Sequence, residues 1–80
     1  MIVRVKYWND SILAYSGAEY TYRTDLPLHK LQKVIAPVGE QGEMKKAIVT
    51  AVNLPVDVIS PSWADRVKKI REIDTGGGGA

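Results

Sequence analysis

Apolar and polar side chains alternate over residues 2–8 of the chain. One face of this segment is apolar and the other is polar and mostly cationic: Val3, Val5 and Tyr7 against Arg4, Lys6 and Trp8. Successive side chains of a β-strand point to opposite faces, so a period of two predicts a strand with one face buried.

Two further strands are expected before residue 25. The short apolar run Ile12–Tyr15 is predicted to form a second strand, and Gly17 can adopt a positive φ that closes the next turn. The segment Glu19–Thr24 is rich in aromatic and β-branched residues, with Tyr20 and Tyr22 on one face. This composition favours a strand.

The next segment has two interpretations. Leu28, Leu31 and Ile35 have the spacing of one helix face, but residues 31–36 also alternate in the manner of a strand. We favour a strand over residues 31–36, ended by Pro37.

A central strand is expected over Met44–Val52, because its β-branched density is typical of a strand inside a sheet. Gly39–Gly42 before it is predicted to be the loop of a hairpin. Val56–Ile59 after it is expected to add a short edge pairing.

Helix-start signals follow these strands. Pro61 suits a first helical turn, and Ser62 with Asp65 three residues later forms a capping-box pattern. We therefore predict a C-terminal helix over about residues 61–71. One stripe of this helix is apolar and is expected to pack on the sheet: Trp63, Val67 and Ile70.

These elements predict a mainly β (α+β) fold. The expected architecture is a small antiparallel β-barrel, or a strongly twisted sheet of about five strands, with one C-terminal helix. The length of 80 residues suits a single domain, which we place at residues 1–74. Residues 75–80 are expected to be a flexible glycine-rich tail, either inert or left over from cloning.

Composition argues against several kinds of chemistry. The chain has no cysteine and one histidine, His29, so neither disulfides nor a structural zinc site is expected. His29 lacks the flanking residues of a catalytic triad, and Glu40 and Glu43 are expected to lie in a solvated loop. The glycine run is not set between a strand and a helix and has no following lysine, so it is no phosphate-binding loop. We predict a protein that is not an enzyme, with no catalytic residue, metal ligand or cofactor.

Location and charge restrict the partners only weakly. The first residues do not form a signal peptide and no run of 18 apolar residues occurs, so we expect a cytoplasmic protein with no membrane partner. The net charge of +2 is compatible with nucleic acid and equally with a solvated surface of mixed charge. A monomer or a weak dimer through an unpaired edge strand is expected.

Aromatic and cationic side chains remain as candidates for binding. Exposed rings beside lysines can stack the bases of single-stranded nucleic acid while the cations follow its phosphates. The predicted nucleic-acid-binding residues are Trp8, Tyr20, Arg23, Lys33 and Lys46. Tyr7, Tyr22 and Trp63 are expected in the core, because a chain without phenylalanine must pack its other aromatics.

Three segments together carry a family resemblance: Tyr20–Tyr22, Val34–Gly39 and Ala47–Thr50. They resemble the aromatic-D-Y, V-x-V-P-F-G and G-I-V-V segments of the N-terminal DNA-binding domain of the primosomal replication-restart helicase and of related small phage and mobile-element proteins. The resemblance covers about 35 of the 80 residues. It implies a small β-barrel that grips the 3′ end of a DNA strand through the aromatic-Asp pair. Thr21 stands at the position of that Asp, and Val38 stands at the position of the aromatic.

The leading hypothesis is a small non-catalytic binding module that contacts single-stranded nucleic acid in a phage or mobile-element context. The alternative is a protein-protein interaction adaptor that uses a strand edge or the helix face. A third hypothesis is a ubiquitin-like protein, which requires residues 28–36 to be helical rather than extended.

Overall fold

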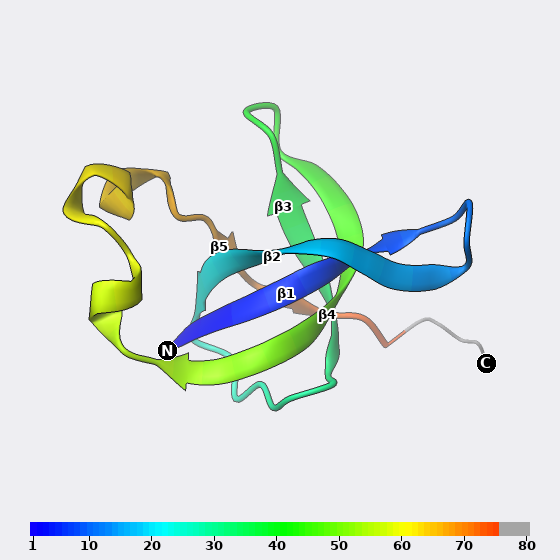
Figure 1. Ribbon diagram of the computed structural model, residues 1–80, viewed down its shortest axis with the longest axis horizontal. Helices are drawn as coiled ribbons and strands as arrows, with labels where there is room; N and C mark the ends of the chain where they lie inside the picture. The colour runs from blue at the N-terminus through cyan, green and yellow to red at the C-terminus, as the bar shows by residue number, and fades with distance from the viewer. Residues whose placement is uncertain (76–80) are drawn as a thin grey trace.

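The computed structural model describes residues 1–75 and contains six strands and two short 3-10 helices (Figure 1). The elements in chain order are β1 (Ile2–Asn9), β2 (Ala14–Thr24), β3 (Lys33–Val38), β4 (Glu43–Leu54), η1 (Val56–Val58), η2 (Pro61–Arg66), β5 (Lys69–Ile70) and β6 (Glu72–Ile73). The strands form one sheet in the order β5-β2-β1-β4-β3-β6. Only the β2–β5 pairing is parallel. The predicted mainly β fold is confirmed, but the sheet is mixed and has six strands.

The alternation predicted for residues 2–8 is confirmed. Val3 and Val5 are fully buried on the inner face of β1, and β4 lies beside β1 in the interior of the sheet as expected. Residues from five strands and from the loop before β3 form one apolar core: Val3, Val5, Tyr22, Leu28, Val34, Ala36, Ala47, Val49 and Ile70.

The strand predicted over Ile12–Tyr15 is wrong in its bounds. Ile12 and Leu13 lie in the turn between β1 and β2, where their side chains are 58% and 73% exposed. Gly17 has the expected positive φ of 91°, but it lies within β2 rather than in a turn. The pairing with β1 shifts register there, so the residues around Gly17 form a β-bulge.

The segment after Pro27 forms a strand, but it begins two residues later than predicted. Leu31 has a positive φ of 73° and its backbone N–H donates to the carbonyl of Val49, which fixes the loop against β4 before β3 begins at Lys33. The strand also continues through Pro37, contrary to the prediction. Since β3 is extended here, the helix required by the ubiquitin-like hypothesis is contradicted.

Pro37 is tolerated because one side of β3 has few strand partners. The β6 strand pairs only with Val34 and Ile35, so Pro37 lies where no second ladder needs its missing N–H. Its carbonyl instead accepts a hydrogen bond from the Tyr22 hydroxyl at 2.7 Å. The hairpin loop predicted at Gly39–Gly42 is confirmed between β3 and β4.

The predicted C-terminal helix over residues 61–71 is wrong. Pro61–Arg66 forms a 3-10 helix without a side-chain cap, and Lys69 onward is extended. A short amphipathic helix is marginal by itself, and strand pairing with β2 and β3 gives the backbone after residue 68 hydrogen-bond partners in the sheet. The edge pairing expected at Val56–Ile59 is likewise replaced by η1.

The short strands β5 and β6 do not close the sheet, so of the two predicted architectures, a small barrel or a twisted sheet, the closed barrel is not formed. β5 and β6 are separated by Arg71 alone, and they extend the two opposite edges of the sheet, beside β2 and β3 respectively. β5 covers only Arg23 and Thr24 of β2. The gap beyond these short pairings is an opening between the edges of β2 and β3.

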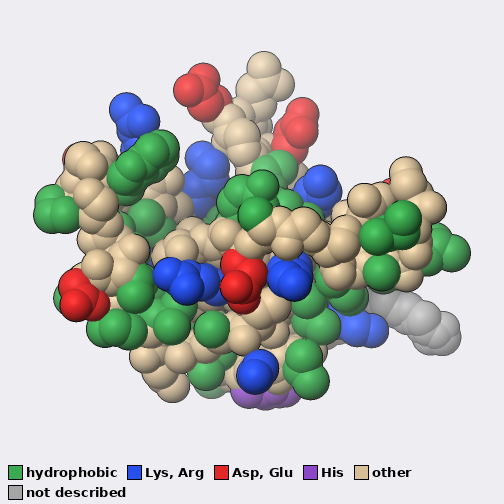
Figure 2. Space-filling model, in the orientation of Figure 1, with side chains coloured by type: hydrophobic (Ala, Val, Ile, Leu, Met, Phe, Trp, Pro, Cys, Tyr) green, Lys and Arg blue, Asp and Glu red, His purple; other side chains and the backbone are tan. Residues whose placement is uncertain are grey.

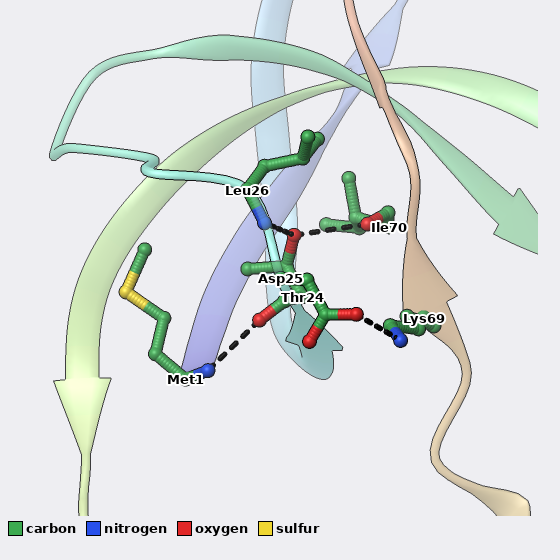
Figure 3. A network of polar contacts seen from close by, with 6 residues as sticks. All are labelled: Met1, Thr24, Asp25, Leu26, Lys69 and Ile70. Carbon is green, nitrogen blue, oxygen red and sulfur yellow. Dashed lines mark hydrogen bonds and ion pairs between the residues drawn. The ribbon is translucent and has the colours of Figure 1, made fainter.

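Thr24 anchors the C-terminal segment to β2 (Figure 3). Its buried hydroxyl donates to the carbonyl of Ile70 at 2.9 Å and accepts from the N–H of Leu26 at 3.0 Å. Its carbonyl accepts from the Met1 ammonium at 2.8 Å, and Asp25 next to it pairs with Lys69. These contacts fix one end of the opening. The tail predicted for residues 75–80 lies, after Thr75, outside the described residues.

Candidate functional site

A groove of about 390 Å³ occupies the opening between β2 and β3. One wall comes from the β2 edge, the opposite wall includes the end of β3, and the η1–η2 segment adds a third side. The residues that line it are Tyr7, Tyr20, Thr21, Tyr22, Val38, Gly39, Val58, Ile59, Ser60, Trp63, Arg66, Val67 and Lys68. The groove thus gathers four of the chain's six aromatic side chains in one place.

Hydrogen bonds fix the tyrosines at the base of the groove. Tyr22 is 4% exposed, and its hydroxyl donates to the carbonyl of Pro37. The hydroxyls of Tyr7 and Tyr22 also bond to each other, and since the Tyr22 proton is engaged with Pro37, Tyr7 is the donor. The chain of contacts joins β1, β2 and β3 beneath the opening.

Burial is the main cause that raises the pKa of both phenols. For Tyr7 and for Tyr22 the loss of water around the ring disfavours the phenolate, so each pKa lies above the ordinary value of 10.0. Both groups are therefore neutral near neutral pH. They act here as fixed apolar rings joined by hydrogen bonds rather than as a source of charge.

Two rings of the groove remain open to solvent. Tyr20 is 47% exposed and stacks on Tyr7 with 4.6 Å between ring centroids and 25° between planes. Trp63 of η2 is 57% exposed, and the Arg66 guanidinium lies 5.1 Å from its ring centroid. The expectation that Trp63 packs in the core is wrong, because it lines the open groove and stays exposed, whereas Tyr22 is buried as predicted and Tyr7 is half-buried.

The charged groups of the groove have one sign. Arg66 and Lys68 line it, and no carboxylate among the described residues does so. Lys45 lies just beyond, with its ammonium 5.1 Å from the centroid of the Tyr7 ring. Exposed aromatic faces together with unopposed cations suit a ligand that is both planar and anionic.

The five residues predicted to bind nucleic acid do not meet at one surface. Tyr20 is the only one that lines the groove. Lys33 and Lys46 alternate with buried Val34 and Ala47 and therefore point to the outer face of β3 and β4.

Trp8 and Arg23 also lie apart from the groove. Trp8 packs edge-on to Tyr15 at 5.0 Å, and its indole N–H donates to Asp10 at 2.6 Å. Trp8 lines a neighbouring hollow beneath the β1–β2 hairpin, together with Tyr7 and Tyr20, rather than the groove itself. The Arg23 side chain is exposed near the end of β2. Its backbone lies opposite that of Lys69 in the parallel pairing of β2 with β5.

The outer face of the sheet carries charges of both signs. Figure 2 shows Lys and Arg side chains on both sides of an acidic side chain across the face that β1 crosses. Glu19 is held beside this strand by the Thr50 hydroxyl, which donates to its carboxylate and whose oxygen lies 3.2 Å from the carbonyl oxygen of Arg4. The alternation of sign makes this face less suited to a polyanion than the groove.

Sequence reasoning missed the residues that η2 and the segment after it contribute. Trp63, Arg66 and Lys68 all fall within the helix predicted over residues 61–71, and none of them was named as a binding residue. The available signal was a tryptophan with cations three and five positions later. Only the tertiary course of the chain brings these side chains opposite Tyr20.

Comparisons of the chain with models of known protein families, with curated proteins and with solved structures find no match. Within residues 1–75, no group of three or more histidine, aspartate or glutamate side chains is placed to hold a metal ion. No helix in that part of the chain has the length and apolarity needed to cross a membrane.

Proposed function

We propose that the protein is a non-catalytic module that binds single-stranded nucleic acid in the groove between β2 and β3. The observation that carries the proposal is the combination of exposed aromatic rings with cations and without carboxylates along the described lining of one groove. Bases stack on aromatic faces irrespective of sequence, and lysine and arginine attract the phosphates.

The two exposed rings supply the stacking surfaces. Tyr20 is supported from below by Tyr7, which limits the side-chain entropy lost when a base stacks on the outer side of its ring. Trp63 presents the larger ring, with Arg66 already placed at its face. A base that lies against either ring leaves its phosphate near Arg66 of η2 and Lys68, the two cations of the groove.

The family resemblance supports the same groove. Tyr20, Thr21 and Tyr22 stand where the helicase domain has its aromatic-Asp-Tyr segment, and all three line the groove. Val38 and Gly39, from the second segment of the resemblance, line it from the other side. Thr21 supplies no carboxylate for a terminal hydroxyl, so we propose binding along a strand without a requirement for its 3′ end.

Titration with a labelled oligothymidylate of about ten nucleotides tests the proposal. We expect binding that weakens as salt is added, because phosphate neutralisation releases counterions. Tyr20→Ala and Trp63→Ala should each weaken binding by roughly 5- to 150-fold, the equivalent of about 1–3 kcal/mol of base stacking. An affinity that is undetectable at low salt, or that does not change with salt, would refute nucleic-acid binding.

Paired charge variants locate the site. Arg66→Gln and Lys68→Gln remove cations from the groove, whereas Lys33→Gln and Lys46→Gln remove cations from the outer face. The first pair should weaken binding and the second should change it little. The reverse result would place the nucleic acid on the outer face and contradict the groove.

A protein-protein adaptor is the second candidate, favoured by the exposed strand edges. Residues 14–22 of β2 have a strand partner only on the β1 side among the described residues, and such an edge can accept an extended peptide. A cationic groove would select an acidic peptide. Stronger binding of a poly-glutamate peptide than of the oligonucleotide at equal salt would favour this candidate over nucleic acid.

A further inference from the structure

A second hollow, of about 460 Å³, lies next to the groove beneath the β1–β2 hairpin. Its lining includes Tyr7 and Tyr20, which also line the groove, so the two hollows meet at the stacked tyrosine pair. The β-bulge at Gly17 shapes its outer wall, because Gly17 and Ala18 line it as well.

Lys45 is the cation of this hollow. It lies near the start of β4 opposite Ala36, whose side chain is buried in the core, and so it lies on the inner face of the sheet. Its ammonium is 5.1 Å from the Tyr7 ring centroid. The side chain is exposed, and no carboxylate of the described residues forms an ion pair with it.

The remaining lining of the hollow is suited to hydrogen bonding. Asn9, Ser11 and Ser16 offer amide and hydroxyl groups. Asp10 is the one carboxylate among the described lining residues, and its Oδ1 accepts the indole N–H of Trp8 at 2.6 Å. The hollow thus holds one cation, one carboxylate that is already hydrogen-bonded to Trp8, several neutral polar groups and the edge of the tyrosine pair, and it fits a nucleotide with one phosphate near Lys45.

We propose that this hollow is a second nucleotide subsite, so that the protein takes at least two consecutive nucleotides with Lys45 at the phosphate between them. The inference rests on the proposed function, since the first nucleotide occupies the groove. A strand whose base stacks on Tyr20 and whose next nucleotide enters the second hollow crosses the tyrosine pair, and Lys45 stands beside that crossing. The ligand class is therefore an oligonucleotide rather than a mononucleotide.

Length-dependent binding tests the subsite. Thymidine monophosphate, the dinucleotide and the tetranucleotide are titrated against the wild-type protein, Lys45→Met and Lys46→Met. Methionine retains an apolar stem without the charge, and Lys46 is the matched control because it neighbours Lys45 but points to the outer face. We expect affinity to rise at least about tenfold from monophosphate to dinucleotide in the wild type, as the second nucleotide adds its own contacts.

In Lys45→Met, that gain should largely disappear, while monophosphate binding stays unchanged. The slope of log affinity against log salt for the tetranucleotide should fall by about 0.7, the value for one phosphate contact on a single strand. Lys46→Met should behave as the wild type.

Two negative results are distinguishable. If the monophosphate binds as tightly as the dinucleotide, or if Lys45→Met weakens both equally or neither, the second subsite is refuted while binding in the groove stands. If no length of oligonucleotide binds the wild-type protein in a salt-dependent way, the proposed function fails and the subsite fails with it.

Discussion

At the scale of single residues, the hydrogen-bonded pair Tyr7 and Tyr22 contributes both to the stability of the fold and to the shape of the groove. The Tyr22 ring belongs to the core, and its hydroxyl reaches the carbonyl of Pro37 on the opposite side of the opening. The Tyr7 ring supports Tyr20. A change at either hydroxyl should therefore affect both the free energy of unfolding and the position of the ring on which a base would stack.

The raised pKa of both phenols predicts loss of stability in alkali. In the unfolded chain each tyrosine titrates near the ordinary pKa of 10.0, whereas in the folded protein burial raises the pKa. Below pH 10 both states keep their protons and this contribution is fully present. Above it the folded state binds more protons than the unfolded state, so the free energy of unfolding falls by up to about 1.4 kcal/mol per pH unit for each tyrosine.

Urea unfolding of the wild type and of Tyr22→Phe between neutral pH and strongly alkaline pH measures this effect. The variant lacks the more buried phenol, so its stability should fall less steeply with pH, although it starts lower by about 1 kcal/mol for the lost hydrogen bond. Equal slopes for the two proteins would show that Tyr22 does not contribute to alkaline unfolding.

At the scale of elements, local patterns predict strands well where alternation and burial agree. The alternation of residues 2–8 predicted β1 because its inner face is the core, and the β-branched run at Met44–Val52 predicted β4 for the same reason. The pattern at residues 61–71 misled because Ile70 fits both a helical stripe and a buried strand position. Pairing with the distant β2 strand, which no local spacing reveals, decides between them.

Gly17 allows the bend in the backbone of β2. Its φ of 91° permits the β-bulge that joins the hairpin arm to the part of β2 that bears Tyr20. An added Cβ would meet no atom within 4 Å, so Gly17→Ala changes backbone preference rather than packing. We expect it to lower the free energy of unfolding by about 1–2 kcal/mol, the cost of a left-handed conformation in an L-residue.

Urea unfolding of Gly17→Ala checks this expectation, with Ala18→Ser as a control because Ala18 is exposed and its φ is negative. The control should lie within about 0.5 kcal/mol of the wild type. A wild-type stability for Gly17→Ala would mean that the bulge relaxes into another backbone conformation.

At the scale of the whole molecule, the candidate site is a consequence of incomplete closure of the sheet. Of its residues only Tyr20 was predicted, because a composition of aromatics and cations does not say which of them face one opening. Arg66 and Lys68 reach the groove because η2 and the residues that follow it pass along the edge of β2 before β5 begins. This placement depends on the backbone N–H of Arg23, which donates to the carbonyl of Lys68 at 2.9 Å.

Amides on the open edge of β2 should change their hydrogen-exchange rates when a ligand binds in the groove. The N–H of Arg23 points away from β1, so strand alternation places the N–H of Thr21 on the same edge, beyond the end of the β5 pairing. In the free protein Thr21 should exchange faster than Tyr20 and Tyr22, whose N–H groups face β1. An oligonucleotide in the groove covers that edge and should therefore slow exchange at Thr21. The slowing should exceed that at outward-facing amides away from the groove.

Amide exchange followed residue by residue by NMR, with and without saturating oligothymidylate, tests this. Equal slowing at every amide would indicate only global stabilisation by the ligand, and unchanged exchange at Thr21 alone would place the strand away from the β2 edge.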